Sequence, residues 1–167
     1  MYLQKINLKN KYALVTGAGK GLGRACSIAL AEAGATIIAL SRTQSDLDKL
    51  EKEIKKVKGK VIKVNCDVMN YKELKENLDK IKIIDVLVNN AGTNIPEPFE
   101  KIKQENMNYL VDLNLKASFL NSLFLKNLLT IGVATKVGAT VFTLILFFAS
   151  STPIPLVKPS IPNFVIL

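Results

Sequence analysis

The stretch Thr16-Gly17-Ala18-Gly19-Lys20-Gly21-Leu22-Gly23 decides the fold, because it lies between a buried strand and a helix. Before it, Tyr12-Ala13-Leu14-Val15-Thr16 is a short apolar run, typical of a parallel strand covered on both faces. After it, residues 21–33 place small and apolar residues at helical spacing, and Gly34 ends the helix. The spacing predicts an inner helix face made of Leu22, Ala25, Ala29 and Leu30.

The same alternation continues along the chain. Strands are expected at 36–40, 61–64 and 84–88, each a short run rich in apolar residues. Helices are expected to begin at Ser45, with Asp48 completing a near capping box, and at Asn70, with Glu73 in that role. Strict alternation predicts an α/β fold with a doubly wound parallel sheet covered on both faces.

Composition excludes several classes of protein and of site. The 167 residues suffice for one domain, and 49% hydrophobic with 22% charged residues excludes disorder, collagen and coiled coil. The absence of histidine removes the Ser-His-Asp triad, the Cys-His pair and the histidine type of zinc site, so no metal is expected. Two cysteines, and no secretory signal in residues 1–12, predict a cytoplasmic protein.

The charge distribution divides the chain. Residues 1–116 hold all 14 acidic and 20 of the 23 basic residues, a net charge of +6, whereas residues 117–167 hold three lysines and no acid. We therefore expect an α/β domain at 1–120 and, at 121–167, an atypical apolar tail that is not the normal continuation. A truncated or frame-shifted reading is favoured over a genuine variant. A membrane anchor is unlikely, because Pro153 and Pro155 leave only about 13 continuous apolar residues.

The glycine stretch is a candidate phosphate site. Glycines let the backbone approach a pyrophosphate, and a helix N-terminus offers free N–H groups and a positive dipole end. After the second strand comes Ser41-Arg42, where an NAD site would carry an acid. A hydroxyl and a guanidinium suit a 2′-phosphate, and Lys20 adds a second cation, so NADP is favoured over NAD. The alternative for the glycine stretch is a turn that serves only close packing of the helix on the sheet. The alternative for Arg42 is a solvated residue at the start of a helix.

Two further motifs establish a resemblance. Cys66-Asp67-Val68 follows the third strand and Asn89-Asn90-Ala91-Gly92 follows the fourth. With Thr-Gly-x-x-x-Gly-x-Gly, in that order, they resemble the short-chain dehydrogenase/reductase family over about residues 7–120. The resemblance implies that 1–120 is a Rossmann-type dinucleotide-binding domain, with a sheet truncated after the fourth or fifth strand. The segments 89–99 and 112–116 are similar to its sugar- and polyol-oxidising and 3-oxoacyl-carrier-protein reductase-like members.

The resemblance implies roles for individual residues. Gly17, Gly21 and Gly23 would line the pyrophosphate, Asp67 and Val68 would meet the adenine, and 90–92 would lie under the ribose and nicotinamide. Asn114 matches the family's catalytic-site asparagine, which kinks a helix and holds a water in a proton relay. Alternatively, Asp67 caps a turn and Asn114 is an ordinary helix residue. The expected cofactor-binding residues are Thr16, Gly17, Gly19, Lys20, Gly21, Leu22, Gly23, Ser41, Arg42, Asp67, Val68, Asn89, Asn90, Ala91 and Gly92.

The family's proton donor is missing from its expected place. Its chemistry needs a tyrosine, a lysine four residues later that lowers the tyrosine pKa, and an upstream serine. No tyrosine follows Tyr109. The pair Tyr71 and Lys75 has the right spacing but precedes Asn114, on a helix expected to pack on the flank of the sheet, so we expect it to be structural. Ser150-Ser151 and Lys158 come without a partner tyrosine and are not assigned.

The sequence therefore supports two functions. The first is an NADP-dependent oxidoreductase that interconverts a secondary alcohol and a ketone, or acts on a 3-oxoacyl thioester, present here without its catalytic Tyr and Lys. The alternative is a catalytically silent nucleotide-binding or oligomerising Rossmann protein, since intact family members form homo-oligomers. Nucleic-acid binding is not expected, because acids are interleaved with the lysines of 49–63.

Overall fold

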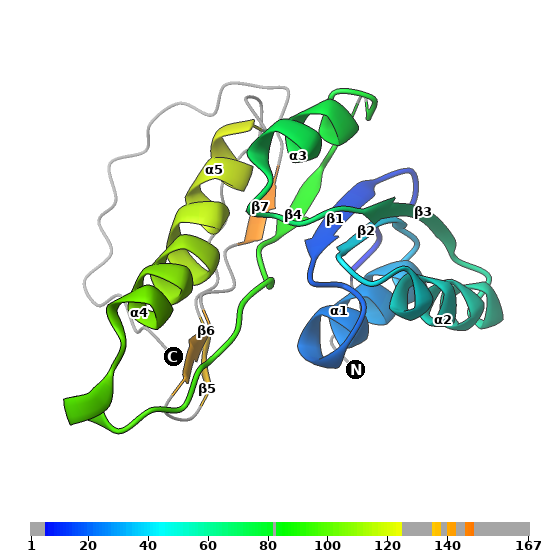
Figure 1. Ribbon diagram of the computed structural model, residues 1–167. Helices are drawn as coiled ribbons and strands as arrows, with labels where there is room; N and C mark the ends of the chain where they lie inside the picture. The colour runs from blue at the N-terminus through cyan, green and yellow to red at the C-terminus, as the bar shows by residue number, and fades with distance from the viewer. Residues whose placement is uncertain (1–5, 82, 125–134, 138–139, 143–145, 149–167) are drawn as a thin grey trace, which may run out of the picture.

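A parallel sheet lies at the centre of the computed structural model, which describes residues 6–81, 83–124, 135–137, 140–142 and 146–148. Its four parallel strands are β1 (Tyr12–Thr16), β2 (Thr36–Ser41), β3 (Lys60–Asn65) and β4 (Val86–Val88). They lie in the order β3-β2-β1-β4 (Figure 1). The direction of winding reverses between β1 and β4, so the expected Rossmann-type, doubly wound sheet is confirmed.

Three short strands lie in the apolar part of the chain. β7 (Leu146–Phe148) pairs antiparallel with β4 and becomes the fifth strand of the sheet, while β5 (Thr135–Val137) and β6 (Thr140–Phe142) form a separate two-stranded sheet. The rest of the expected tail, including Ser150-Ser151 and Lys158, lies outside the described residues.

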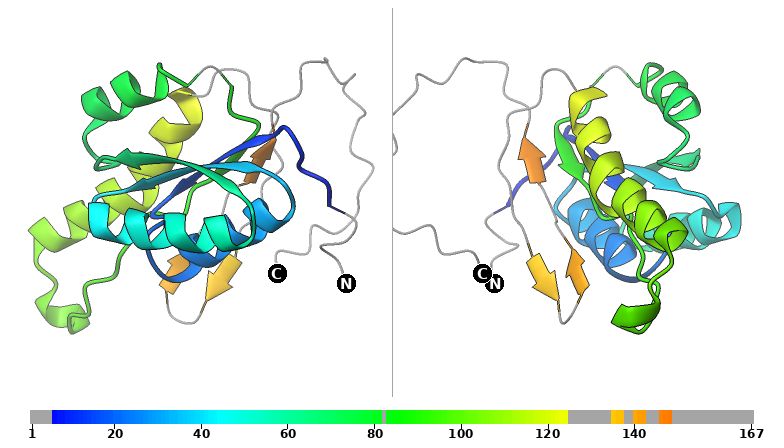
Figure 2. Two further views of the ribbon diagram at one scale, coloured as in Figure 1. Left: turned by 90° about the vertical axis from the view of Figure 1, so that its right-hand side faces the viewer. Right: turned by 60° about the vertical axis from the view of Figure 1, so that its left-hand side comes forward.

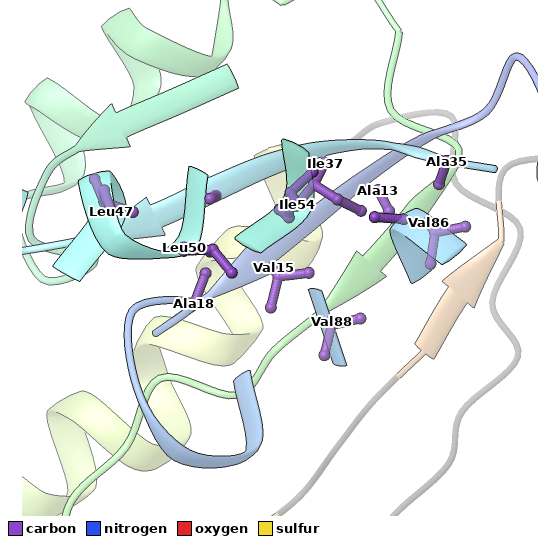
Figure 3. Close-up of a cluster of buried hydrophobic side chains, with 12 residues drawn as sticks. Ala13, Val15, Ala18, Ala35, Ile37, Leu47, Leu50, Ile54, Val86 and Val88 are labelled. Carbon is purple, nitrogen blue, oxygen red and sulfur yellow. The ribbon is translucent and has the colours of Figure 1, made fainter. Parts of the chain in front are cut away.

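Helices cover both faces of the sheet, as Figures 1 and 2 show. α1 (Gly21–Glu32) and α2 (Gln44–Lys56) lie on one face, and α3 (Tyr71–Leu78), α4 (Gln104–Val111) and α5 (Ala117–Phe124) lie on the other. Successive side chains of a strand point to opposite faces, so each strand contributes to two cores. Val15 packs with Leu50 and Ile54 of α2 (Figure 3), and its neighbour Leu14 packs with Leu74 of α3.

The inner face of α1 differs in part from the prediction, since Leu30 packs against the core as expected and Leu22 does not. Leu22 is 52% exposed, and the fully buried positions are Gly23, Ser27 and Ala31, which recur every four residues. A Cβ at Gly23 would overlap the carbonyl oxygen of Gly17, so the helix lies too close to the glycine loop for a larger side chain. The hydroxyl of Ser27 donates to the Gly23 carbonyl at 2.8 Å and is thus satisfied within the helix. Close packing selected the smallest side chains instead of the most apolar ones.

The two predicted helix starts have different outcomes. The near capping box at Ser45 and Asp48 is wrong: α2 begins at Gln44, and its N-cap residue Thr43 makes no side-chain capping bond. At α3 the prediction is confirmed, since the Asn70 side chain accepts from the Glu73 backbone N–H and donates to the Glu73 carboxylate at 2.8 Å. The first bond satisfies a backbone N–H that a helix start leaves free, and the second holds the capping side chain in place.

A single turn of π-helix, η3 (Asp112–Lys116), joins α4 to α5. Four exposed apolar side chains lie four residues apart along this helical run: Met107, Val111, Leu115 and Phe119. Within the part of the chain that the structure describes, no helix has the length and apolar character needed to cross a membrane.

Candidate functional site

A cavity of about 240 Å³ opens at the carboxyl end of the strands, beside the β1–α1 turn. Because Thr16 pairs with Leu40, and Val15 with Val88, the loops that follow β1, β2 and β4 all leave the sheet at this edge. Eight of the expected residues line the cavity: Gly17, Gly19, Lys20, Ser41, Arg42, Val68, Ala91 and Gly92. Five lining residues were not predicted: Leu40, Thr43, Asp46, Cys66 and Leu113.

Backbone geometry explains two of the loop glycines. Gly17 has a φ of +64°, and a Cβ there would lie 3.0 Å from the Ala91 Cα, so both conformation and packing require glycine. Gly21 has a φ of +53°, and nothing lies within 4 Å of the place of its Cβ. Conformation alone requires glycine at Gly21, and the space beside it is open.

The N-terminus of α1 has the properties of an anion site. Its N-cap residue is Lys20, among the described residues no side chain caps it, and its first turn carries no acid. The first N–H groups of a helix have no partner within the helix and carry a partial positive charge. A phosphate at this place would meet N–H groups without competition from a capping side chain.

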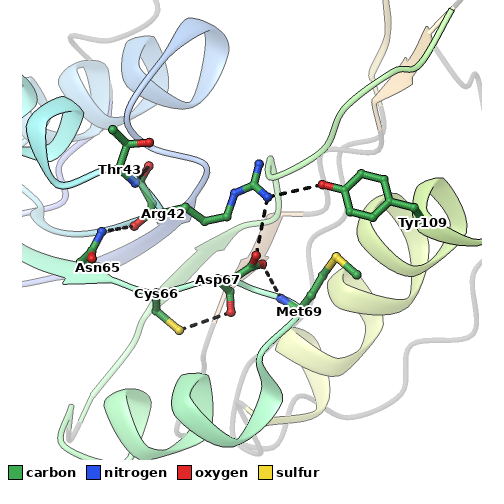
Figure 4. Close-up of polar contacts among 8 residues, drawn as sticks. Arg42, Thr43, Asn65, Cys66, Asp67, Met69 and Tyr109 are labelled. Atoms are coloured by element: carbon green, nitrogen blue, oxygen red, sulfur yellow. Dashed lines mark hydrogen bonds and ion pairs between the residues drawn. The ribbon is translucent and has the colours of Figure 1, made fainter. Parts of the chain in front are cut away.

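Both predicted cations engage carboxylates. The ammonium of Lys20 lies 3.1 Å from the Asp46 carboxylate, and the Arg42 guanidinium lies 3.6 Å from the Asp67 carboxylate. Arg42 also donates to the phenol oxygen of Tyr109 in α4 at 3.4 Å (Figure 4). The bond to Tyr109, with a smaller contribution from Asp67, raises the pKa of Arg42 above its ordinary value. The guanidinium therefore stays charged at the rim of the cavity.

Asp67 caps a turn, which was the alternative role considered for it, and it also pairs with Arg42. One carboxylate oxygen faces Arg42, and the other accepts the backbone N–H of Met69 at 2.9 Å, so Asp67 also caps the turn that follows β3 (Figure 4). The Cys66 thiol donates to the Asp67 carbonyl at 3.3 Å. Arg42 and Cys66 line the cavity, whereas Asp67 and Met69 do not.

Thr16 and Asn90 hold the glycine loop in place but do not line the cavity. The hydroxyl oxygen of Thr16 accepts the backbone N–H groups of Asn90 and Ala91, both at 3.0 Å. The side-chain amide of Asn90 donates to the carbonyls of Thr16 and Gly17 at 3.1 and 3.3 Å. These four bonds tie the end of β1 to the end of β4, which positions the loop at the cavity floor.

Asn89 faces the neighbouring helix instead of the cavity. Its amide donates to the Ser118 carbonyl and to the Ser122 hydroxyl at 3.2 Å each, and its oxygen accepts from the Asn121 amide at 3.2 Å. Asn89 thus joins β4 to α5. The expected cofactor-binding residues that do not line the cavity are Thr16, Gly21, Leu22, Gly23, Asp67, Asn89 and Asn90.

Asn114 lies within the π turn η3, in agreement with the expected interruption of a long helix. Its amide oxygen accepts the Thr93 N–H, and its amide nitrogen donates to the Thr93 carbonyl, both at 2.9 Å. This double contact fixes the side chain against the segment that follows Gly92. A π turn in an α-helix is frequent at functional sites, because it changes the direction of side chains.

The Tyr71 and Lys75 pair lies elsewhere. Tyr71 is half-buried on α3, and the Lys75 ammonium pairs with the Asp79 carboxylate at 2.5 Å on the same helix. Neither residue lines the cavity at the strand ends. In the described segments no cluster of three or more Cys, Asp or Glu residues is placed to hold a metal ion.

Comparison with known proteins identifies the family. The sequence model described as short chain dehydrogenase matches residues 11–144. The chain belongs to the short-chain dehydrogenase family. The family resemblance inferred from the glycine, Asp-Val and Asn-Asn-Ala-Gly motifs is confirmed.

Two curated relatives of this short-chain dehydrogenase are similar over about two thirds of its length. L-xylulose reductase from Mesocricetus auratus is 38% identical over 112 residues, which cover 67% of this chain and 44% of the relative. The 3-oxoacyl-[acyl-carrier-protein] reductase from Thermotoga maritima is 36% identical over 118 residues, which cover 68% and 48%. The chain thus spans less than half the length of these two relatives.

One solved structure with a similar fold contains a bound nucleotide. It comes from Beutenbergia cavernae, is described as an NAD(P) dependent gluconate 5-dehydrogenase, and contains bound NADP at low occupancy. It matches with a TM-score of 0.67 and 31% identity over 72% of this chain and 49% of that one.

Proposed function

We propose that this short-chain dehydrogenase binds a nicotinamide dinucleotide at the carboxyl edge of its sheet, with NADP preferred over NAD. The observation that carries the proposal is the convergence of three features on one cavity: the glycine loop, the uncapped start of α1, and the cations Lys20 and Arg42. Each suits a phosphate, and ligands of open α/β sheets bind at the switch point where this cavity lies.

Each part of the chain has a distinct role in holding the nucleotide. The N–H groups at the start of α1 bind the pyrophosphate, and Ser41, Arg42 and Lys20 bind the 2′-phosphate. The apolar side chain of Val68 borders the adenine side of the cavity. The segment 90–92 supports the ribose and nicotinamide, held in place by the Thr16 hydroxyl.

The reaction we propose for the intact enzyme is the interconversion of a secondary alcohol and a ketone. When bound, the nicotinamide supplies or accepts the hydride. The named relatives act on a sugar and on a 3-oxoacyl thioester, and both substrate classes fit this reaction. Asn114 would hold a water of the proton relay, and its double contact with Thr93 supports this role because it fixes the asparagine.

We propose that the 167 residues themselves turn over ketones poorly. Hydride delivery creates an alkoxide that needs a proton within hydrogen-bond reach, and no tyrosine follows Tyr109 to supply it. Losing a positioned general acid lowers the rate about 10²- to 10⁴-fold. The absence of this tyrosine also supports a second candidate function, that of a catalytically silent nucleotide-binding or oligomerising protein. A Tyr-x-x-x-Lys in another reading frame after codon 120 would favour the enzyme and the frame-shifted origin of 121–167.

Compartment and partners follow from the same proposal. We place the protein in the cytoplasm, with a small-molecule substrate. The two thiols, one half-buried and one buried, form no disulfide with each other, which suits a reducing compartment. We also propose that the protein pairs with a second copy of itself, as the resemblance implies.

Titration calorimetry with NADPH and NADH tests the binding proposal. The wild-type chain is expected to bind both, NADPH more tightly. Arg42→Gln should weaken NADPH about tenfold and leave NADH within about twofold, because the guanidinium meets only the 2′-phosphate. The control is Lys55→Gln, which removes an equal charge from a lysine that pairs with Glu51 on α2. Failure of the wild-type chain to bind either nucleotide would refute the proposal.

A second assay addresses catalysis. NADPH oxidation is followed with small ketones and 3-oxoacyl thioesters on the 167-residue chain. We expect no turnover at the rate of intact family members. Tyr71→Phe should leave any residual rate unchanged, since Tyr71 lies on α3 outside the cavity.

A further inference from the structure

Asp46 is a nearly buried acid inside the candidate cofactor cavity. It lies in the first turn of α2, its side chain is 8% exposed, and it lines the cavity together with Lys20 and Ser41. One carboxylate oxygen lies 3.1 Å from the Lys20 ammonium, and the other lies 3.9 Å from the Lys49 ammonium. A buried carboxylate needs such partners, because its charge has lost most of its water.

The carboxylate stands beside the groups that would hold a 2′-phosphate. A Cβ at Gly19 would lie 2.8 Å from the Asp46 Cβ and 3.0 Å from the Ser41 hydroxyl, so these three residues are adjacent. Lys20 belongs to the same loop as Gly19, and its pairing with Asp46 joins that loop to α2. The ammonium expected to meet a phosphate therefore already contacts a carboxylate of the protein.

We propose that Asp46 is a specificity-determining residue, which competes with a nucleotide 2′-phosphate for Lys20 and so limits the preference for NADP. The inference rests on the nucleotide binding proposed above and deepens it. A ribose 2′-hydroxyl can donate a hydrogen bond to the Asp46 carboxylate, whereas a phosphate offers mainly acceptors and a like charge. The net preference is then set by Ser41, Arg42 and Lys20 acting against Asp46.

The test compares two probes that differ only in the 2′-phosphate. Calorimetry on the full chain measures the dissociation constants of 2′,5′-ADP and 5′-ADP, and their ratio reports the contribution of the phosphate. Asp46→Asn should raise the preference for 2′,5′-ADP about fivefold to tenfold. The matched control is Asp48→Asn, because Asp48 lies two residues further on α2, is 48% exposed, and pairs with Lys63. It should change the ratio by less than about twofold.

Two more variants separate a specific effect from damage to α2. Asp46→Glu keeps the charge and should keep a ratio close to that of the wild type. Lys20→Gln alters a side chain that is 79% exposed, and Lys49 remains beside the Asp46 carboxylate. The change should lower the preference for 2′,5′-ADP about tenfold, and circular dichroism checks that the variant is folded. In the Lys20→Gln background, Asp46→Asn should have a smaller effect than in the wild type, because the two residues act on one another.

The outcomes distinguish the two proposals. If the wild type binds both probes but Asp46→Asn leaves the ratio unchanged, lowers it, or only matches Asp48→Asn, the role of Asp46 is refuted and nucleotide binding stands. If the wild type binds neither probe, nucleotide binding and the role of Asp46 are both refuted.

Discussion

The Arg42 guanidinium donates a hydrogen bond to the Tyr109 phenol oxygen at 3.4 Å, although 67 positions separate the two residues in the sequence. Arg42 follows β2 and Tyr109 lies in α4, so the bond links the end of β2 to that helix (Figure 4). This contact, together with the Asp67 carboxylate, sets the position of the cation that we assign to the 2′-phosphate.

Tyr109→Phe should weaken NADPH binding about two- to fivefold and leave NADH binding unchanged, since Arg42 loses a group that orients it. The free energy of unfolding should fall by less than about 1 kcal/mol, because the Arg42 side chain is 58% exposed. Calorimetry and urea denaturation measure the two effects. Equal losses for NADH and NADPH would show instead that the whole cavity had changed.

Thr16→Val should lower the free energy of unfolding by about 2–4 kcal/mol, because it leaves two backbone N–H groups, those of Asn90 and Ala91, without their acceptor. Thr16→Ser keeps the hydroxyl and should lose less than about 1.5 kcal/mol. Urea denaturation followed by circular dichroism compares the two variants. Equal losses would contradict the importance of the hydroxyl and point to the lost methyl group.

Alanine substitutions at two adjacent residues of α1 should have very different effects on the free energy of unfolding. Leu22→Ala changes an exposed side chain and should alter the free energy of unfolding by less than about 0.5 kcal/mol. Gly23→Ala places a Cβ against the Gly17 carbonyl and should destabilise the protein by about 3 kcal/mol or more. Thermal and urea unfolding of both variants provide the measurement. A large loss on Leu22→Ala would restore the helix face predicted from hydrophobic spacing.

The thiol of Cys66 predicts a pH dependence of stability. Burial, aided by the nearby charge of Glu73, raises the pKa of the Cys66 thiol from 9.0 to about 11. The folded state therefore holds this proton more tightly than the unfolded state, and its stabilising contribution is present below about pH 9 and is lost as the pH rises through about 11.

Urea denaturation of the wild type and of Cys66→Ala, at about pH 8 and about pH 10.5, tests this dependence. The wild type should lose more stability between the two pH values than the variant does, because only the wild type carries the thiol. Tyrosines and lysines titrate equally in both proteins and cancel in the difference. An equal loss in both would mean that the thiol titrates alike in the folded and unfolded chains.

The strands of the sheet were predictable because β1, β2 and β4 are buried on both faces and leave continuous apolar runs in the sequence. The candidate site was predictable in part for a related reason: loops after parallel strands meet at one edge, where eight of the expected residues line the cavity. The inner face of α1 was not predictable, because the glycine and serine that form it carry no hydrophobic signal in the sequence. The role of Asp46 was not predictable either. In the sequence it lies among alternating charges, and its burial depends on Gly19 and Lys20, which lie 26 or more positions earlier in the chain. A local sequence pattern does not reveal such a contact.

The π turn η3 also means that the helical run 104–124 holds one residue more than a regular helix would need there. An α-helix rotates by about 100° per residue, so deleting one residue from 112–116 would restore regular winding and turn everything after it by about that angle. Ser118, Asn121 and Ser122 would then rotate away from Asn89, while Asn114 could no longer keep both bonds to Thr93. We therefore expect a single-residue deletion in this helix to be more damaging than most substitutions. The extra residue should be kept in any engineered variant.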